Sequence, residues 1–271
     1  MNKAEESNMF SDIIVERHES WVEIIINRPE KLNAIRELTA SELLTAITDA
    51  EADVSMKVIL IKGMEKAFCT GVDTSEFKQE PEEIFELWRR RKRSRKVNQL
   101  FRNLPEVSKP VIAVVEGFAL GGGFELALLC DFIVAGEGAK FGLPEAKIGL
   151  MPGGAGTQTL ARIVGKPLAK ELIWTGRRLS ATDALNLRIV NHLTATGEAI
   201  VKAREIAQEI ANNAPLSVMF CKQSIERGFE SSLAEGMMVE ADSFFALAFS
   251  KDKEEGLTAF REKRSPQFKG F

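Results

Sequence analysis

The feature that most limits the fold is an alternation of short apolar runs with helical patterns over the first 195 residues. The stretch "DIIVERHESWVEIIINRP" (12–29) predicts two strands around a tight turn at His18–Ser20. The runs "KVILIKG" (57–63) and "KPVIAVVEG" (109–117) predict buried strands, and residues 39–53, which lie between the hairpin and the first of these runs, predict an amphipathic helix. Strands that alternate with helices in this way indicate an α/β architecture.

From about Ala195 onward the pattern becomes helical throughout. Helical segments are predicted at 198–213, 215–229, 231–250 and 252–264. We therefore expect an α/β core over residues 1–195 and a C-terminal helical region over residues 196–271. A helical tail of this kind can pack on its own core or on another subunit.

Composition argues against several classes of function. The 36 basic and 39 acidic residues give a net charge of −3, so no global attraction to nucleic acid or anionic membranes is expected. No apolar run approaches the roughly 20 residues of a membrane helix. The polar, acidic first residues are typical of neither a secretory signal nor a transit peptide, which favours a cytoplasmic location. The three scattered cysteines and two unclustered histidines predict neither a disulfide framework nor a metal site.

A run of glycines precedes a lone carboxylate in "GFALGGGFELALLCDF" (117–132). Glycines at the entrance to a helix let the backbone approach a ligand, because no Cβ intrudes. The first helical amides lack internal partners and lie at the positive end of the dipole, so they suit a developing negative oxygen. Glu125 follows Gly122 by three positions, which puts an acid/base carboxylate beside such an amide, as chemistry next to a carbonyl requires. The alternative is that Glu125 only complements the helix dipole.

A second carboxylate follows in "FGLPEAKIGLMPGGAGTQ" (141–158). Pro144 suits the first position of a helix, and Glu145 comes directly after it, so a routine acidic residue in a first turn is an equal alternative. The glycine-rich loop that ends this stretch precedes another helix, but it has neither the P-loop pattern nor the last glycine of the dinucleotide fingerprint. Nucleotide binding is therefore not predicted. The G-x-S-x-G elbow of a hydrolase nucleophile is also missing.

A third glycine, Gly71, follows a buried strand in "KAFCTGVDTSEF" (66–77). A loop at this point could present a second backbone amide near Val72. Together with the Gly122 amide it would form a hole with two donors. The sequence alone does not show that the two amides meet.

The segment "FELWRRRKRSRKVNQLF" (85–101) is locally very basic. Such a charge run is most typical of a solvated helix face, here with Leu87, Val97, Leu100 and Phe101 turned inward. The functional alternative is attraction of a polyanion, either the phosphates of a small ligand or RNA.

Six stretches appear together, and in order, in one known family. They are "NRPEKLNA", "AFCTGVD", "KPVIAVVEGFALGGGFELALLCDF", "FGLPEAKIGLMPGGAGTQ", "WTGRRLSATDA" and "AFREKRSPQF", spread over residues 12–268. The chain resembles the enoyl-CoA hydratase/isomerase (crotonase) superfamily. The resemblance implies a spiral of repeated ββα units, followed by a helical region that mediates trimer contacts. It usually implies a homo-hexamer made of two trimers.

The resemblance also implies a ligand and its reactive groups. The ligand is an acyl-CoA thioester, so coenzyme A is part of the substrate and no separate cofactor is needed. The thioester oxygen would bind in an oxyanion hole made by the amides of Val72 and Gly122. The two catalytic glutamates match Glu125 and Glu145, which have the separation found in the hydratases.

Contacts to coenzyme A are implied in two parts of the chain. The adenine and ribose end lies along the first matched stretch in the family, and the 3′-phosphate is often met by a basic residue of the last helix of a neighbouring subunit. The matching positions are Lys31, Leu32, Ala34 and Asp73 in the core, and Lys263, Phe260 and Phe244 in the helical region.

Hydration is the reaction that the resemblance favours: reversible syn addition of water to a trans-2-enoyl-CoA, as in fatty acid metabolism. By analogy Glu125 handles the water and Glu145 is the acid, although the reverse assignment stays open. A specialised hydratase or dehydratase such as a carnitinyl-CoA dehydratase-like enzyme is an alternative, and so is an isomerase, which typically has only one of the two carboxylates. An RNA-binding homologue and a catalytically silent scaffold subunit are the alternatives from other classes. The acyl group and the direction of flux stay open.

Overall fold

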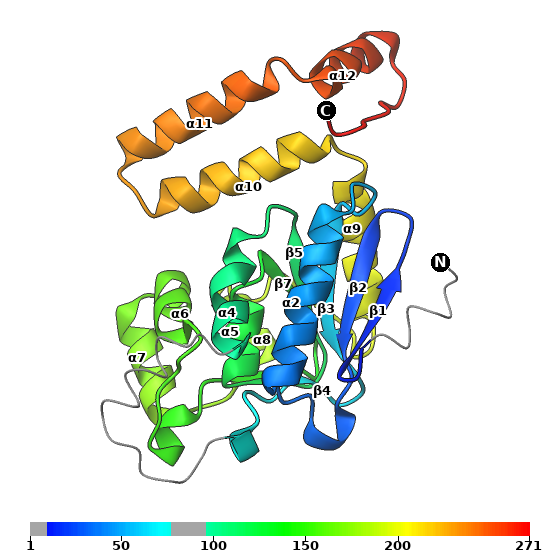
Figure 1. Cartoon of the computed structure of the whole chain (residues 1–271). Helices are drawn as coiled ribbons and strands as arrows, with labels where there is room; N and C mark the ends of the chain where they lie inside the picture. Colours follow the sequence, from blue (N-terminus) through cyan, green and yellow to red (C-terminus); the bar gives the residue numbers. More distant parts are fainter. Residues whose placement is uncertain (1–9, 77–95) are drawn as a thin grey trace.

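The computed structural model describes residues 10–76 and 96–271, and their strands form two sheets (Figure 1). The larger sheet has the order β1-β2-β3-β5-β7-β10, and all its pairs are parallel except the β1–β2 hairpin. Its strands are β1 (Ile13–Arg17), β2 (Trp21–Ile26), β3 (Val58–Gly63), β5 (Val111–Val115), β7 (Phe132–Gly136) and β10 (His192–Thr194). The predicted hairpin around residues 18–20 and the predicted strands at 57–63 and 109–117 are confirmed.

The smaller sheet has the order β4-β6-β8-β9. Its strands are β4 (Ala67–Cys69), β6 (Phe118–Leu120), β8 (Lys140–Gly142) and β9 (Leu179–Ser180). The first three are parallel, and β9 pairs antiparallel with β8. The helices are α2 (Glu37–Ala52), α4 (Lys96–Asn103), α5 (Gly122–Leu128), α6 (Gly156–Val164), α7 (Lys166–Thr175), α8 (Ala181–Asn186), α9 (Ala199–Ala211), α10 (Pro215–Phe229), α11 (Leu233–Leu247) and α12 (Lys251–Glu262).

The two sheets grow together because the chain repeats one unit. In each repeat the chain adds a strand to the larger sheet, turns, and adds a short strand to the smaller one: β3 then β4, β5 then β6, β7 then β8. The spiral of ββα units and the C-terminal helices are thus present as predicted. The repeat also places the carboxyl ends of β4, β6 and β8 along one edge of the smaller sheet.

Apolar side chains fill both faces of the larger sheet. The main core cluster includes Phe68, Phe124 and Phe141, all nearly inaccessible to solvent. On the other face, α9 packs through alanines spaced four residues apart against Val58, Leu60 and Ile112. Because alanine carries no long side chain, the helix axis lies close to the strands. Helix α9 lies within the tail predicted from residue 196, yet it covers the sheet, and the helices that leave the body begin with α10 (Figure 1).

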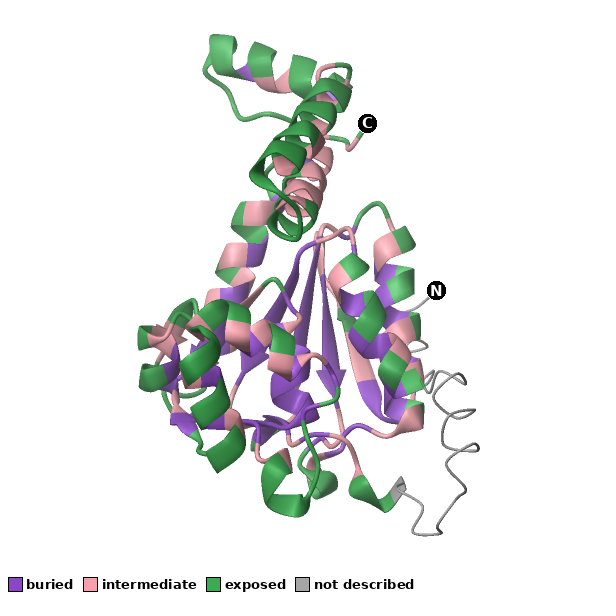
Figure 2. Ribbon diagram, turned by 90° about the vertical axis from the view of Figure 1, so that its left-hand side faces the viewer, coloured by how far each residue is buried: buried purple, intermediate pink, exposed green. Residues whose placement is uncertain are grey.

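Helices α10, α11 and α12 extend from the body, and most of their residues are exposed or half-buried (Figure 2), including many large apolar ones. Helix α10 contacts the body through the Lys222 ammonium, which lies 2.9 Å from Asp131 and donates to the Lys109 carbonyl. Apolar exposure on this scale is unusual for a protein surface and marks a site of interaction. The exposed residues are Ile225, Phe229, Leu233, Met237, Met238, Phe244, Phe245, Phe249, Leu257 and Phe260.

Close packing of α5 on β4 depends on the third glycine of the run. A Cβ on Gly123 would lie 2.1 Å from the Cys69 carbonyl oxygen, so strand and helix would have to separate. We expect Gly123→Ala to lower the free energy of unfolding by about 3 kcal/mol, the upper range for overpacking a core. Thermal and denaturant unfolding measure this. Gly153→Ala is the control, because a Cβ there meets nothing within 4 Å; equal stability of the two variants would contradict the prediction.

Candidate active site

Three loops meet at the carboxyl edge of the smaller sheet. The loop after β4 carries Gly71 and Val72, the turn after β6 begins α5 at Gly122, and the loop after β8 carries Glu145. The Gly121 amide donates to the Gly142 carbonyl at 2.9 Å, which ties the second loop to the third. Residues far apart in the sequence thus converge because their strands are parallel neighbours.

Two backbone amides lie side by side at this edge. Ile35 and Val72 form a parallel bridge in which the amides of Ile35 and Asp73 donate, so the Val72 N–H points to the opposite side. A Cβ on Gly122 would lie 3.4 Å from the Val72 nitrogen. Gly122 is the first residue of α5, so its N–H has no partner within the helix. The structure brings together the two amides predicted to form the oxyanion hole.

The Glu125 side chain is fixed by a neighbouring loop. Its Oε1 accepts hydrogen bonds from the amides of Gly154 at 2.8 Å and Gly156 at 2.7 Å, and its side chain is buried within α5. Ala155 lies between these donors with φ of +85°, a left-handed conformation that only a closely packed loop imposes on a residue with a Cβ. Because Gly156 begins α6, the carboxylate also lies at the positive end of a helix dipole.

The Glu145 side chain is held by fewer hydrogen bonds from the described residues than the Glu125 side chain. Pro144 precedes a short 3₁₀ helix (Glu145–Ile148) rather than entering an α-helix as predicted, because the chain turns again at Gly149 with φ of +76°. A Cβ on Gly121 would lie 3.2 Å from Glu145 Oε1, so the carboxyl group lies at the start of α5. Its Oε2 is buried and accepts no hydrogen bond from the described residues.

The surroundings raise the pKa of both carboxyl groups. Burial raises the pKa of Glu125 from 4.5, and the amide hydrogen bonds from Gly156 and Gly154 oppose that change. Burial also raises the pKa of Glu145 from 4.5, and the negative charge of Glu125 raises it further. Proton exchange near neutral pH requires such shifts, and adjacent buried carboxyls produce them.

A cavity of about 510 Å³ opens onto both carboxylates and the amide pair. Its lining includes Val97, Asn98 and Phe101 of α4, and also Leu150 and Met151. Val97, Leu100 and Phe101 are turned inward, as predicted. The cavity is therefore a mainly apolar space with a few converging polar groups, as is typical of a small-molecule site.

The predicted coenzyme A positions of the core lie beside this cavity. The carbonyl of Leu32 accepts from the hydroxyl of Thr70, a residue that lines the cavity, at 3.1 Å. Lys31 and Leu32 are exposed. Asp73 instead has structural partners: hydrogen bonds from Ser75 and the nearby Arg28 guanidinium lower its pKa to about 2.

The positions predicted in the helical region are not brought to the same cavity. Phe244 lies on α11, Phe260 on α12 and Lys263 directly after it, and all three are exposed. Figure 1 shows these helices on the far side of the body from β4 and the following loop. Within one chain none of these three residues lines the cavity beside Glu125.

Sequence reasoning missed two parts of the site. The pattern of the glycine-rich loop suggests only a nucleotide loop, which it does not match, whereas in the structure the loop amides hold Glu125. The available signal was a glycine run directly before a helix. Phe101 was expected only to be turned inward, and nothing in the sequence placed its ring beside Gly122 and Gly154.

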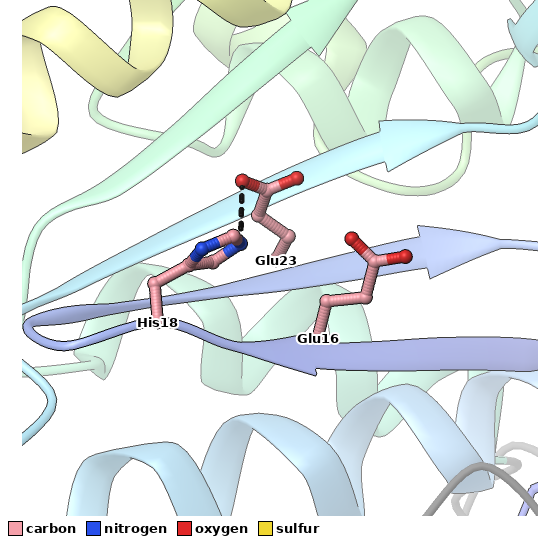
Figure 3. Close-up of side chains that lie close together, drawn as sticks. All are labelled: Glu16, His18 and Glu23. Carbon is pink, nitrogen blue, oxygen red and sulfur yellow. Dashed lines mark ion pairs between the residues drawn. The ribbon is translucent and has the colours of Figure 1, made fainter. Parts of the chain in front are cut away.

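A cluster of Glu16, His18 and Glu23 is the one group of metal-ligand type among residues 10–76 and 96–271 (Figure 3). The Glu23 carboxylate already accepts two hydrogen bonds from Arg204, at 2.7 and 2.9 Å, and one from the Trp21 indole. His18 stacks on the Trp21 ring. Glu23 is thus held in an ion pair with Arg204, and His18 Nε2 lies 3.0 Å from the same carboxylate, so we assign no metal to the group.

Two further predictions concern the basic segment and membrane-spanning helices. The basic segment that suggested a polyanion lies at 88–96, and all of it except Lys96 falls outside the described residues. None of the described helices is both long enough and apolar enough to pass through a membrane.

Known proteins resemble this chain in both sequence and structure. Residues 16–270 match the family model described as enoyl-CoA hydratase/isomerase. The human protein "Enoyl-CoA hydratase domain-containing protein 2, mitochondrial" is 43% identical over 92% of this chain and 85% of its own length. The short-chain-enoyl-CoA hydratase of Clostridium acetobutylicum is 38% identical over 94% of this chain and 96% of its own. The crystal structure of an enoyl-CoA hydratase from Bacillus anthracis superposes with a TM-score of 0.89 at 35% identity, covering 96% of this chain and 100% of that one.

Proposed function

Since the chain belongs to the enoyl-CoA hydratase/isomerase family and is a hydro-lyase, we propose that it adds water reversibly to a trans-2-enoyl-CoA thioester. The observation that carries the proposal is the cavity into which Glu125, Glu145 and the amide pair converge. Coenzyme A enters as part of the substrate, so these side chains and amides supply the chemistry.

The amides of Val72 and Gly122 are proposed to bind the thioester oxygen. Addition of water to C3 moves electrons toward that oxygen, so an enolate-like negative charge develops there in the transition state. Two N–H groups directed at one point stabilise this charge more than the neutral ground state, and one such donor contributes about 10² to 10³ in rate.

Glu125 is proposed to be the base. The two amide hydrogen bonds and the start of α6 favour its ionised form, and they fix the carboxylate so that its remaining acceptor capacity is directed at a water. As the water oxygen bonds to C3, Glu125 takes the proton that the water loses.

Glu145 is proposed to be the acid. Its buried Oε2 has no partner among the described residues, and the neighbouring negative charge of Glu125 favours its protonated form. It donates that proton to C2 as the double bond is consumed. Both bonds form on the face of the substrate that the two carboxyl groups share, so addition is syn.

The alternatives differ in what they require of these groups. An isomerase moves one proton between two carbons and needs only one carboxyl group, whereas here two line the cavity. A specialised hydratase with a charged acyl group would use the same reacting groups and differ only in the acyl pocket. RNA binding stays an alternative that depends on the basic segment outside the described residues.

Hydration of crotonyl-CoA tests the proposal directly. Loss of the ultraviolet absorbance of the conjugated thioester, with 3-hydroxybutyryl-CoA as product, is the expected result. If a panel of short, branched and aromatic enoyl-CoA thioesters all keep their absorbance with the purified protein, the proposed reaction is wrong.

The pH dependence of kcat/KM is expected to be bell-shaped. Activity should fall at low pH, where Glu125 becomes protonated and can no longer accept a proton. It should also fall at high pH, where Glu145 loses the proton that it must donate. Because both pKa values are raised from 4.5, both limbs should lie above that pH. The two groups interact, so the limbs report the pair. A rate that stays constant from pH 5 to 9 would contradict these roles.

A homo-oligomer, as a trimer or a hexamer of two trimers, is proposed from the exposed apolar faces of α10 to α12. Family members are typically oligomeric, and this surface would be costly to leave in water. In such an assembly α12 of one copy can approach the cavity of another. Cytoplasmic location and a role in fatty acid metabolism stay proposals; the human relative is named as mitochondrial.

Lys263 is proposed to bind the 3′-phosphate of coenzyme A held by a neighbouring copy. We expect Lys263→Ala to weaken binding of coenzyme A thioesters by about fivefold, the upper range for an exposed charge pair. Binding of pantetheine thioesters, which lack that phosphate, should not change. Calorimetry with both ligand types measures the difference, and equal weakening of the two would remove Lys263 from the phosphate site.

A further inference from the structure

The ring of Phe101 lies between two glycines of the candidate site. A Cβ on Gly154 would lie 2.9 Å from ring carbon Cδ2, and one on Gly122 would lie 3.5 Å from Cζ. The base of the ring therefore meets the loop that holds Glu125, and its tip meets the first residue of α5. No other aromatic side chain lines the described part of this cavity.

For a thioester bound as proposed above, these contacts would put the ring beside the reacting carbons. A thioester oxygen at the amides of Val72 and Gly122 fixes C1 near the tip of the ring. C3 must then lie within reach of Glu125, on the side of the Gly154 loop. The chain from C4 onward meets Phe101, together with Val97 one helical turn earlier.

The position of the ring is fixed by the core. Phe101 is 8% exposed, and Leu100 beside it on α4 is fully buried in the main core cluster. The ring also packs closely on the Gly154 loop, where an added Cβ would lie 2.9 Å from Cδ2 and 3.0 Å from Cδ1. The surface that it offers to a ligand is apolar, as is that of Val97.

We propose that Phe101 determines acyl-chain specificity by occupying the space that a longer chain would need, so that short, uncharged enoyl groups are the preferred substrates. This inference rests on the proposed function, because the thioester is located from its oxyanion hole. It adds to that function a substrate class and the residue responsible for it.

The test measures binding and hydration separately. Calorimetry compares butyryl-, octanoyl- and decanoyl-CoA on the wild type, Phe101→Leu and Phe101→Ala. We expect Phe101→Ala to raise the affinity for octanoyl-CoA relative to butyryl-CoA by at least about tenfold, as for a pocket that gains several methylene contacts, with Phe101→Leu in between. Leu100→Ala is the matched control, because it removes a buried side chain from the same helix without lining the cavity, and its ratio should equal that of the wild type.

The outcomes separate the two proposals. An unchanged octanoyl-to-butyryl ratio in both Phe101 variants would overturn the specificity role, and so would a wild type that already prefers octanoyl-CoA. Crotonyl-CoA hydration by the wild type is followed alongside. A shifted binding ratio without any hydration would refute the proposed reaction and still support Phe101 as the residue that limits the chain. Phe101→Leu keeps the test valid if Phe101→Ala does not fold.

Discussion

Glu145→Gln is expected to lower kcat for crotonyl-CoA hydration by about 10² to 10⁴, the range for loss of a positioned acid. The substitution keeps the size of the side chain but removes the carboxylic acid that is proposed to protonate C2. KM should change little, because the thioester oxygen and coenzyme A are bound elsewhere. Steady-state kinetics measure both constants. Glu137→Gln, a change to an exposed carboxylate, is the control and should leave both unchanged.

Glu145→Gln is also expected to change the stability of the protein, in a direction that the raised pKa of Glu145 determines. The folded-state pKa of Glu145 is raised above 4.5, so its contribution to stability is present below that pH and is lost as pH rises through the raised value. Because glutamine does not ionise, Glu145→Gln removes this loss of stability at high pH. At pH 8 we expect Glu145→Gln to unfold at a Tm equal to or above that of the wild type. Reduced activity together with a clearly lower Tm would indicate a structural role for Glu145 instead.

Glu125→Gln is expected to lower kcat by at least about 10², because a neutral amide cannot take a proton from water. The glutamine carbonyl can still accept the hydrogen bonds of Gly154 and Gly156, so the loop should keep its conformation. Product formation with crotonyl-CoA and thermal unfolding are measured on the same samples. Full hydratase activity in this variant would exclude Glu125 as the base.

Glu125→Ala is the informative comparison for that variant. It also removes the proton acceptor, but it leaves two buried amides without a partner, at a cost of about 1 to 3 kcal/mol each. We expect both variants to be inactive and only Glu125→Ala to lose stability. Equal stability of the two would mean that the carboxylate does not hold the loop.

Much of the fold was predictable because local patterns agree with the tertiary structure. Strands β3 and β5 are continuous apolar runs, as strands buried on both faces require, and helix α10 begins at Pro215, within the segment predicted from its pattern. Where the structure differs from the prediction, the cause is a contact between segments that are far apart in the sequence. Helix α9 resembles the following helices in its sequence, yet its alanines let it pack on the larger sheet.

The site shows the same division. The sequence by itself determined the candidate groups, since the spacing of Gly122 and Glu125 and the family stretches predicted the two carboxylates and the two amides that line one cavity in the structure. Only the tertiary structure decided how these groups differ. Glu125 is fixed by amides 29 and 31 residues away, while the buried Oε2 of Glu145 accepts no hydrogen bond from the described residues. Burial, hydrogen bonding and the position of the Phe101 ring all arise from contacts between distant segments, which a local pattern does not encode.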